Sequence, residues 1–182
     1  MGTSQHQKSE TRKTIIDAAA KLFRERGVDG VSVAQVMDAA GLTHGGFPRH
    51  FASKQELVNA ALAEALKTTG NADADGIRDF ARHYLTTQHR DGRGSGCVFA
   101  ALGSELSRAP ADTRHVLTEM IQHQVDVFSS AGDDQSSRNI GSWAAMIGAM
   151  VLARIVDSPA LSDEILTATR QFIGADDGNP AA

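Results

Sequence analysis

Gly41–Lys54 reads GLTHGGFPRHFASK, and this stretch decides the fold. Gly41 is a residue that stops helices, and Thr43, two positions later, is a favoured N-cap for the next one. Only a tight turn fits between two helices so closely spaced, as in a helix-turn-helix. Ser53 and Glu56 then form a capping box, which predicts that a further helix starts there.

Two helices are predicted before the turn. Apolar residues at helical spacing after Thr11 predict the first helix. Gly27 is expected to end it as a C-terminal cap. Ser32 and Gln35 form another capping box, and an apolar face continues from there to Gly41. The apolar positions of the two helices are Ile15, Ile16, Ala19, Leu22, Phe23, Val33, Val36, Met37 and Ala40. Because a helix-turn-helix places the start of its last helix in the major groove, the segment predicts DNA binding.

The order of these features resembles the N-terminal domain of TetR-family transcriptional regulators. The resemblance rests on Val-Ser-Val-Ala-Gln-Val at 31–36, Ala-Gly-Leu-Thr at 40–43, and Gly-Phe-X-Arg-His-Phe-X-Ser-Lys at 46–54. It implies an all-α fold of about nine helices, with an N-terminal three-helix helix-turn-helix domain. A C-terminal helical domain would then bind a ligand and form the homodimer.

Charge divides unevenly along the chain. Residues 1–57 carry 8 Lys+Arg and 6 Asp+Glu, a net of +2, whereas the remaining residues carry 10 and 16, a net of −6. We expect a DNA-binding domain at 1–57, with the linker helix starting at Ser53, and a ligand-binding and dimerisation domain at 58–174. An acidic tail at 175–182 is expected to be disordered. Because a net of +2 is modest, a dimer engaging two half-sites is the expected DNA-binding species.

The candidates for DNA contact are Ser32, Thr43, His44, Gly45, Phe47, Arg49, His50 and Lys54. His50 follows the family's Arg-His-Phe pattern, in which the histidine commonly reaches a phosphate, and Arg49 either does the same or is solvated. Lys54, in the first turn of the linker helix, is expected to bind a phosphate. Gly45 allows a close approach of backbone to DNA. Phe47 is expected mainly in the core, with contact to a thymine methyl as a further role.

Pro48 departs from the family pattern, which usually has tyrosine at this position. A proline inside a helix costs about 3 kcal/mol, and Gly45 and Gly46 each cost about 1 kcal/mol more. Either the carbonyl of His44 tilts outward, or the regular helix begins at Pro48 itself, where proline is favoured. Each alternative distorts the surface presented to DNA, so we expect weaker or altered DNA binding.

Apolar spacing predicts further helices at 77–85, 98–106 and 116–128, which are expected to frame a ligand cavity. The candidates for its lining are Phe80, Tyr84, Cys97, Phe99, Met120, Trp143 and Met146. Ordinary core packing is the alternative for each of them. Apolar stripes at 140–155 and 161–173 predict two further helices. The family resemblance implies that these two helices of each subunit form a four-helix dimer interface.

Other classes of function find little support in the sequence. Cys97 is the only cysteine; a buried, inert thiol is the favoured interpretation, and a sensor thiol at a helix N-terminus is the alternative. The histidines lack the spacing of metal ligands, so neither a metal nor a cofactor is expected. No catalytic signature suggests an enzyme. The longest apolar run, 144–153, is too short to span a membrane, so a cytoplasmic protein is expected.

The sequence therefore predicts a ligand-responsive, homodimeric transcriptional regulator. It would act as a repressor that binds palindromic double-stranded operator DNA and is released by a small, largely apolar effector. The alternative is a ligand-binding or interaction dimer whose DNA binding is weakened or lost through Pro48.

Overall fold

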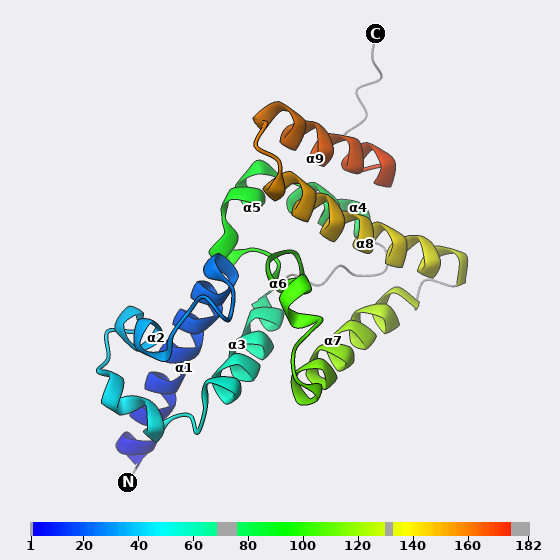
Figure 1. Ribbon diagram of the computed structural model, residues 1–182. Helices are drawn as coiled ribbons and strands as arrows, with labels where there is room; N and C mark the ends of the chain where they lie inside the picture. The colour runs from blue at the N-terminus through cyan, green and yellow to red at the C-terminus, as the bar shows by residue number, and fades with distance from the viewer. Residues whose placement is uncertain (1, 69–75, 130–132, 176–182) are drawn as a thin grey trace. The chain divides into compact units, whose positions relative to one another are not determined.

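The computed structural model describes residues 2–68, 76–129 and 133–175, and every regular element among them is helical (Figure 1). The chain forms two compact units. The first combines residues 1–69 with 93–116, and the second combines residues 70–92 with 117–182. The all-α prediction is confirmed, and nine α-helices lie within the described residues.

The first unit contains the predicted helix-turn-helix. Its elements are α1 (Gly2–Arg26), α2 (Val33–Ala39), the 3₁₀ helix η1 (His44–Arg49), α3 (Lys54–Thr68), η2 (Arg93–Ser95), α6 (Val98–Leu106) and the start of α7 (Ala111–Ser129). Gly27 ends α1 with a φ of 78°. Ser32 Oγ accepts the N–H of Gln35 at 3.2 Å, and the Gln35 side chain accepts the N–H of Ser32 at 2.8 Å. The predicted cap and capping box are therefore both present.

Aromatic and aliphatic side chains form the core of the first unit, where α1 packs against α2 and α3 (Figure 1). Those that are almost completely buried include Ile15, Phe23, Met37, Phe51 and Leu57. The ring of Phe47 stacks on that of Phe51, with the centroids 5.6 Å apart. Burying a side chain of this size contributes about 1.5–3 kcal/mol. These two aromatic residues therefore anchor η1 in the core.

The recognition element is a 3₁₀ helix with Pro48 inside it. At its start the N–H of Gly46 donates to the carbonyl of Thr43, three residues earlier, at 3.0 Å. The two glycines and the proline all disfavour an α-helix. A 3₁₀ helix pairs residues three apart, so the chain does not need the α-helical bond to the His44 carbonyl that Pro48 cannot make. Because the helical segment begins at His44, the alternative in which the helix begins at Pro48 is wrong.

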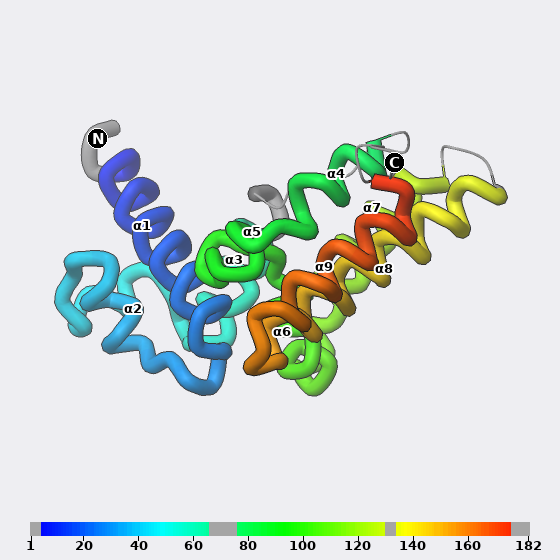
Figure 2. The backbone as a smooth tube through the Cα atoms, turned by 90° about the horizontal axis from the view of Figure 1, so that it is seen from above, coloured from blue at the N-terminus to red at the C-terminus, as the bar shows by residue number. Residues whose placement is uncertain are grey.

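The second unit contains the predicted interface helices. Its elements are α4 (Ile77–Tyr84), α5 (Thr87–Asp91), the later part of α7, α8 (Asp133–Ile155) and α9 (Pro159–Ile173). α8 and α9 lie side by side, as both views show, and α4 packs against them (Figures 1 and 2). Ser158 Oγ accepts the N–H of Leu161 at 3.3 Å at the start of α9, and Gly174 ends α9 with a φ of 73°.

The chain just beyond α9 is hydrogen-bonded to α4. Ala175 is buried, and its carbonyl accepts Nε of Arg82 at 3.0 Å. Ala175, predicted as the first residue of the tail, therefore belongs to the folded unit. The rest of the predicted tail, 176–182, lies outside the described residues. No helix in the described part of the chain is long and apolar enough to cross a membrane.

Candidate DNA-binding surface

The exposed side of η1, together with the residue before it, forms the candidate recognition surface. Thr43, His44, Gly45 and Arg49 are exposed, whereas Phe47 is only 8% exposed. Phe47 therefore serves the core, as expected. Thr43 is the N-cap by position, but among the described residues its side chain makes no cap hydrogen bond. Its hydroxyl is thus not committed to the start of the helix.

Ser32 is exposed at the start of α2. Its Oγ accepts one backbone N–H in the capping box, and a serine hydroxyl keeps a donor hydrogen when it accepts. That hydrogen suits a phosphate oxygen. Ser32 can therefore cap its own helix and contact a DNA backbone at the same time.

His50 follows η1 directly and is half-buried. Its Nδ1 atom is buried and has no hydrogen-bond partner in the part of the chain that the structure describes. Burial lowers the pKa of His50 below its ordinary value of 6.5, and the charges of Lys8, Arg12 and Arg49 lower this pKa further. The ring is therefore neutral at pH 7 in the free protein. A nearby anion would favour its protonated form.

An open groove of about 460 Å³ lies beside His50. Gln7, Lys8 and Thr11 of α1 line it together with Arg49 and His50. The sequence prediction did not include these α1 residues because the apolar pattern of the helix starts later in the chain. Thr11 lies four residues after Gln7 and three after Lys8, so it is a neighbour of each on the helix surface. Extending the first predicted helix toward the N-terminus would have identified them.

Lys54 has a different partner from the one predicted. Its ammonium donates to the carbonyl oxygen of Val28 at 2.7 Å. Nearby, Ser53 Oγ accepts the N–H of Glu56 at 3.1 Å, and the Glu56 carboxylate accepts the N–H of Ala52 at 2.8 Å. In the free protein Lys54 therefore stabilises the fold, and its contact with a phosphate stays a prediction.

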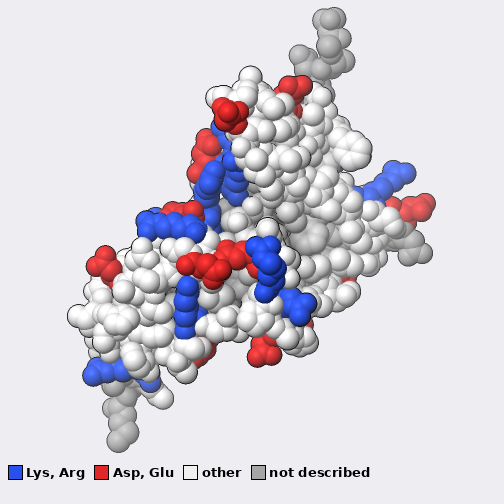
Figure 3. Space-filling model, in the orientation of Figure 1, with Lys and Arg blue, Asp and Glu red and all other residues white. Residues whose placement is uncertain are grey.

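Charges of both signs occur together on one face of the molecule. Figure 3 shows acidic and basic side chains interspersed on the visible face. A broad positive field would speed the approach of DNA from any direction. The groups around His50, among them Lys8, Arg12 and Arg49, supply positive charge at the candidate surface itself.

The N-terminal part of the chain matches a known family. The family model described as bacterial regulatory proteins, tetR family, matches residues 15–61. The chain is 42% identical over 55 residues to the HTH-type transcriptional repressor KstR2 of Rhodococcus jostii, which covers 30% of this chain and 27% of KstR2. It is 37% identical over 132 residues to the HTH-type transcriptional regulator AcrR of Shigella flexneri, which covers 72% of this chain and 57% of AcrR.

Solved structures extend the likeness to most of the chain. A TetR transcriptional regulator from Chloroflexus aurantiacus has a TM-score of 0.67 and 26% identity, over 93% of this chain and 96% of that one. The reduced form of E. coli NemR has a TM-score of 0.70 and 21% identity, over 95% of this chain and 100% of that one. Residues 15–61 therefore form a TetR-family domain. The sequence match to KstR2 spans about a quarter of that protein's length, 27%, so it concerns the helix-turn-helix part.

The residues predicted to line a ligand cavity fall into both compact units of the chain. Those in the first unit are Cys97 and Phe99, and those in the second are Phe80, Tyr84, Met120, Trp143 and Met146. Within the second unit the ring centroids of Phe80 and Tyr84 lie 5.5 Å apart. Trp143 packs edge-on against Phe128, with the ring centroids 6.1 Å apart. These contacts agree with ordinary core packing. A ligand contact for these residues stays a prediction.

Cys97 occupies the N-cap position of α6 and is 3% exposed. This burial agrees with the interpretation of an inert core thiol. A sensor role would require a reagent to reach a sulfur that the folded chain covers.

Proposed function

We propose that this chain is a ligand-responsive, homodimeric transcriptional repressor that binds palindromic operator DNA through α2 and η1. The observation that carries the proposal is that Thr43, His44 and Arg49, on η1 and the residue before it, are exposed, while Phe47 and Phe51 anchor η1 in the core. Polar groups on a short helix can reach base edges in the major groove. Because one such segment makes few contacts, two copies must bind together.

Large apolar side chains on α8 and α9 support the dimer. Leu152 is 54% exposed, Ile155 71%, Leu161 45% and Phe172 81%. Large apolar side chains exposed on two helices that pack together are typical of a protein interface. Gly148 faces open space, which lets a second helix approach closely. The partner we propose is a second copy of the chain, so that α8 and α9 of both subunits form a four-helix interface.

Release of the operator follows from a shift between two forms of the dimer. The half-sites of a palindromic operator lie about 34–36 Å apart, one helical turn of DNA. A small, largely apolar effector that prefers a dimer with another spacing of the recognition elements would therefore release the DNA. Operator DNA must then weaken effector binding by the same factor. Such a regulator acts in the cytoplasm, where bacterial DNA lies.

The test is a titration of the purified protein with a duplex from its own promoter region, at two salt concentrations, with Pro48→Tyr measured in parallel. We expect sequence-specific binding by the unmodified chain that weakens steeply with salt. Binding by the Pro48→Tyr variant alone would replace the proposal with the alternative, a dimer whose DNA binding is lost through Pro48. Absence of specific binding by both proteins would overturn the repressor function.

A further inference from the structure

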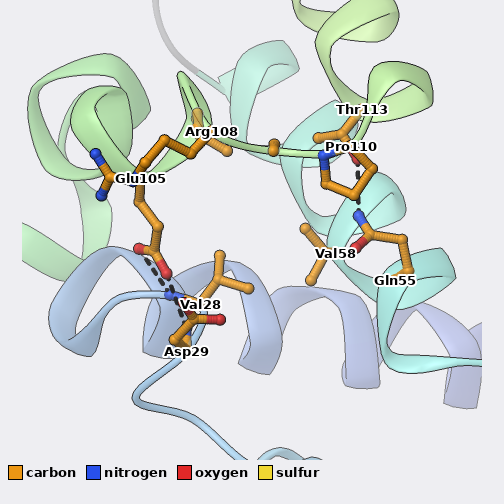
Figure 4. Close-up of a pocket in the computed structure, with 10 residues that line it drawn as sticks. Val28, Asp29, Gln55, Val58, Glu105, Arg108, Pro110 and Thr113 are labelled. Atoms are coloured by element: carbon orange, nitrogen blue, oxygen red, sulfur yellow. Dashed lines mark hydrogen bonds between the residues drawn. The ribbon is translucent and has the colours of Figure 1, made fainter.

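The turn between α1 and α2 is held by side chains from two other helices of the first unit. The N–H of Val28 donates to Glu105 Oε2 at 3.0 Å, and the N–H of Asp29 donates to Glu105 Oε1 at 2.8 Å. Lys54 donates to the carbonyl of Val28 at the same turn. Figure 4 shows the Glu105 carboxylate reaching down from α6 to these two backbone groups. Hydrogen bonds with a charged partner are stronger than neutral ones, so this contact constrains the turn.

The position of Glu105 is unfavourable without this contact. Glu105 lies in the last turn of α6, where the helix dipole disfavours a negative charge. The two N–H groups of the turn offset that cost. The fit is also close, because a Cβ added at Gly27 would lie 3.0 Å from Glu105 Oε2. A Cβ at Gly30 would meet the carbonyl oxygen of Arg26 at 2.4 Å.

Other contacts fix the neighbourhood of Glu105 to the helix-turn-helix. The Gln55 side-chain amide on α3 donates to the hydroxyl of the fully buried Thr113 at 2.7 Å. Nε of Arg24 on α1 donates to the carbonyl of Gly94 at 2.8 Å. A cavity of about 170 Å³ lies between the turn, α3 and the corner that joins α6 to α7 (Figure 4). Residues 93–116 are therefore part of the same compact unit as the recognition surface.

We propose that Glu105 is a positioning residue for DNA recognition, because it fixes the turn from which α2 starts. The inference rests on the proposed function. Ser32, the candidate phosphate contact, lies three residues after Asp29, and Val31 between them is buried at 1% exposure. A shift of the turn therefore displaces Ser32 and the start of α2 together. A movement of the corner between α6 and α7 would shift Glu105, and through its hydrogen bonds to Val28 and Asp29 it would shift the start of α2 as well.

The experiment compares Glu105→Gln with Arg108→Ala. Gln has nearly the same size as Glu but offers a single carbonyl acceptor to two N–H groups. Arg108 lines the same cavity and is exposed, so its truncation controls for changes at this corner that leave the turn intact. Each protein is titrated with the promoter duplex and with a scrambled duplex of equal length. Hydrogen exchange of the Val28 and Asp29 amides is measured without DNA, and Glu105→Asp, which keeps the charge on a shorter side chain, is measured as a second variant.

We expect Glu105→Gln to weaken binding to the promoter duplex about tenfold and to leave binding to the scrambled duplex within about twofold. In Glu105→Gln the Val28 and Asp29 amides should exchange faster than in the unmodified protein. Glu105→Asp should lie between the two proteins in both affinity and exchange rate, and Arg108→Ala should match the unmodified protein in both. An equal loss on both duplexes, or unchanged exchange at the two amides, would overturn the positioning role. If the unmodified protein does not distinguish the duplexes, the repressor function fails, and the exchange data still decide whether Glu105 holds the turn.

Discussion

The guanidinium carbon of Arg12 lies 4.4 Å from the centroid of the Phe51 ring. This cation–π contact joins α1 to the aromatic anchor that follows η1. Because Phe51 is the neighbour of His50 in the chain, the contact also places a positive charge near the His50 imidazole, and Arg12 helps to lower the pKa of that ring. The charges around the candidate phosphate contact therefore come from α1 as well as from η1.

We predict that operator affinity increases as the pH falls. The pKa of His50 is lowered in the free protein, so the ring is neutral at pH 7 and gains a proton only in more acidic solution. A DNA phosphate beside the ring favours the charged form, so operator binding takes up a proton. Titrations between about pH 7.5 and about pH 5.5 at constant ionic strength measure this dependence. His50→Gln should bind with an affinity that changes less with pH, and an identical pH dependence in both proteins would contradict the phosphate contact.

The stability of the free protein should change with pH in the opposite direction. A histidine whose folded pKa is lowered contributes stability that is present above its unfolded pKa of about 6.5 and is lost as the pH falls through the folded pKa. His89 also has a lowered pKa because of burial, so acidification destabilises the fold at two sites. The contribution of His50 is the difference between the unfolding free energies of the unmodified protein and His50→Gln, measured by denaturant titration across the same pH range.

Local signals were sufficient to predict the elements of the helix-turn-helix. Gly27 and Gly41 have the positive φ that helix ends favour, and the Ser32 capping box involves residues only three apart. The 3₁₀ form of η1 was not predicted, because it depends on competition between helix types at Pro48. The partners of Lys54 could not be predicted either, since Val28 lies 26 residues earlier and meets it only after folding.

The predicted ligand cavity shows the same limit. Apolar spacing correctly placed the helices that carry Phe99 and Trp143, but it contains no information about which helices pack together. The structure assigns these two residues to different compact units. Glu105 carried no signal at all, because a single acidic residue near a helix end is usually solvated. Its role depends on two backbone groups 77 and 76 residues earlier in the chain.

We predict that Pro48→Tyr binds the operator about tenfold more tightly than the unmodified protein. Pro48 is exposed within η1 and has no side-chain donor, whereas a tyrosine hydroxyl at the same place can bond to a phosphate. Pro48→Ala separates the two contributions, because it restores the backbone N–H without adding the hydroxyl. An affinity gain in Pro48→Ala as large as in Pro48→Tyr would assign the effect to helix winding. No gain in either variant would show that Pro48 does not impair binding.

Lys8→Ala should reduce the salt dependence of operator binding. Lys8 lines the groove beside His50, and each phosphate contact adds about 0.9 to the slope of log affinity against log salt. We expect the slope to fall by about one unit for each subunit of the dimer. Lys13→Ala is the control, because Lys13 is on the same helix but donates to Asp17 at 2.7 Å. Equal slopes for the two variants would exclude Lys8 as a phosphate contact.

Gly45→Ala should separate folding from DNA binding. A Cβ at Gly45 would meet nothing within 4 Å, so alanine fits and should raise the unfolding free energy by roughly 0.5–1 kcal/mol. The same methyl group would stand between the backbone and the DNA and should lower operator affinity. Gly103→Ala on α6, where a Cβ also meets nothing within 4 Å, should be stabilising without an effect on DNA. A Gly45→Ala protein with unchanged affinity would show that the backbone does not approach DNA closely there.

Phe172→Asp should separate the subunits of the proposed dimer. Phe172 is 81% exposed on α9, so an aspartate there costs the isolated subunit little but places a charge in an apolar interface. Removing an aromatic anchor from an interface costs about 2 kcal/mol or more, which raises the dimer dissociation constant at least about thirtyfold. Sedimentation equilibrium measures this constant. Operator affinity should fall with it, since only the dimer spans two half-sites. Gln171→Asp adds the same charge at the neighbouring exposed position. If both variants remain dimeric to the same extent, the interface lies elsewhere and the exposed face of α9 has another role.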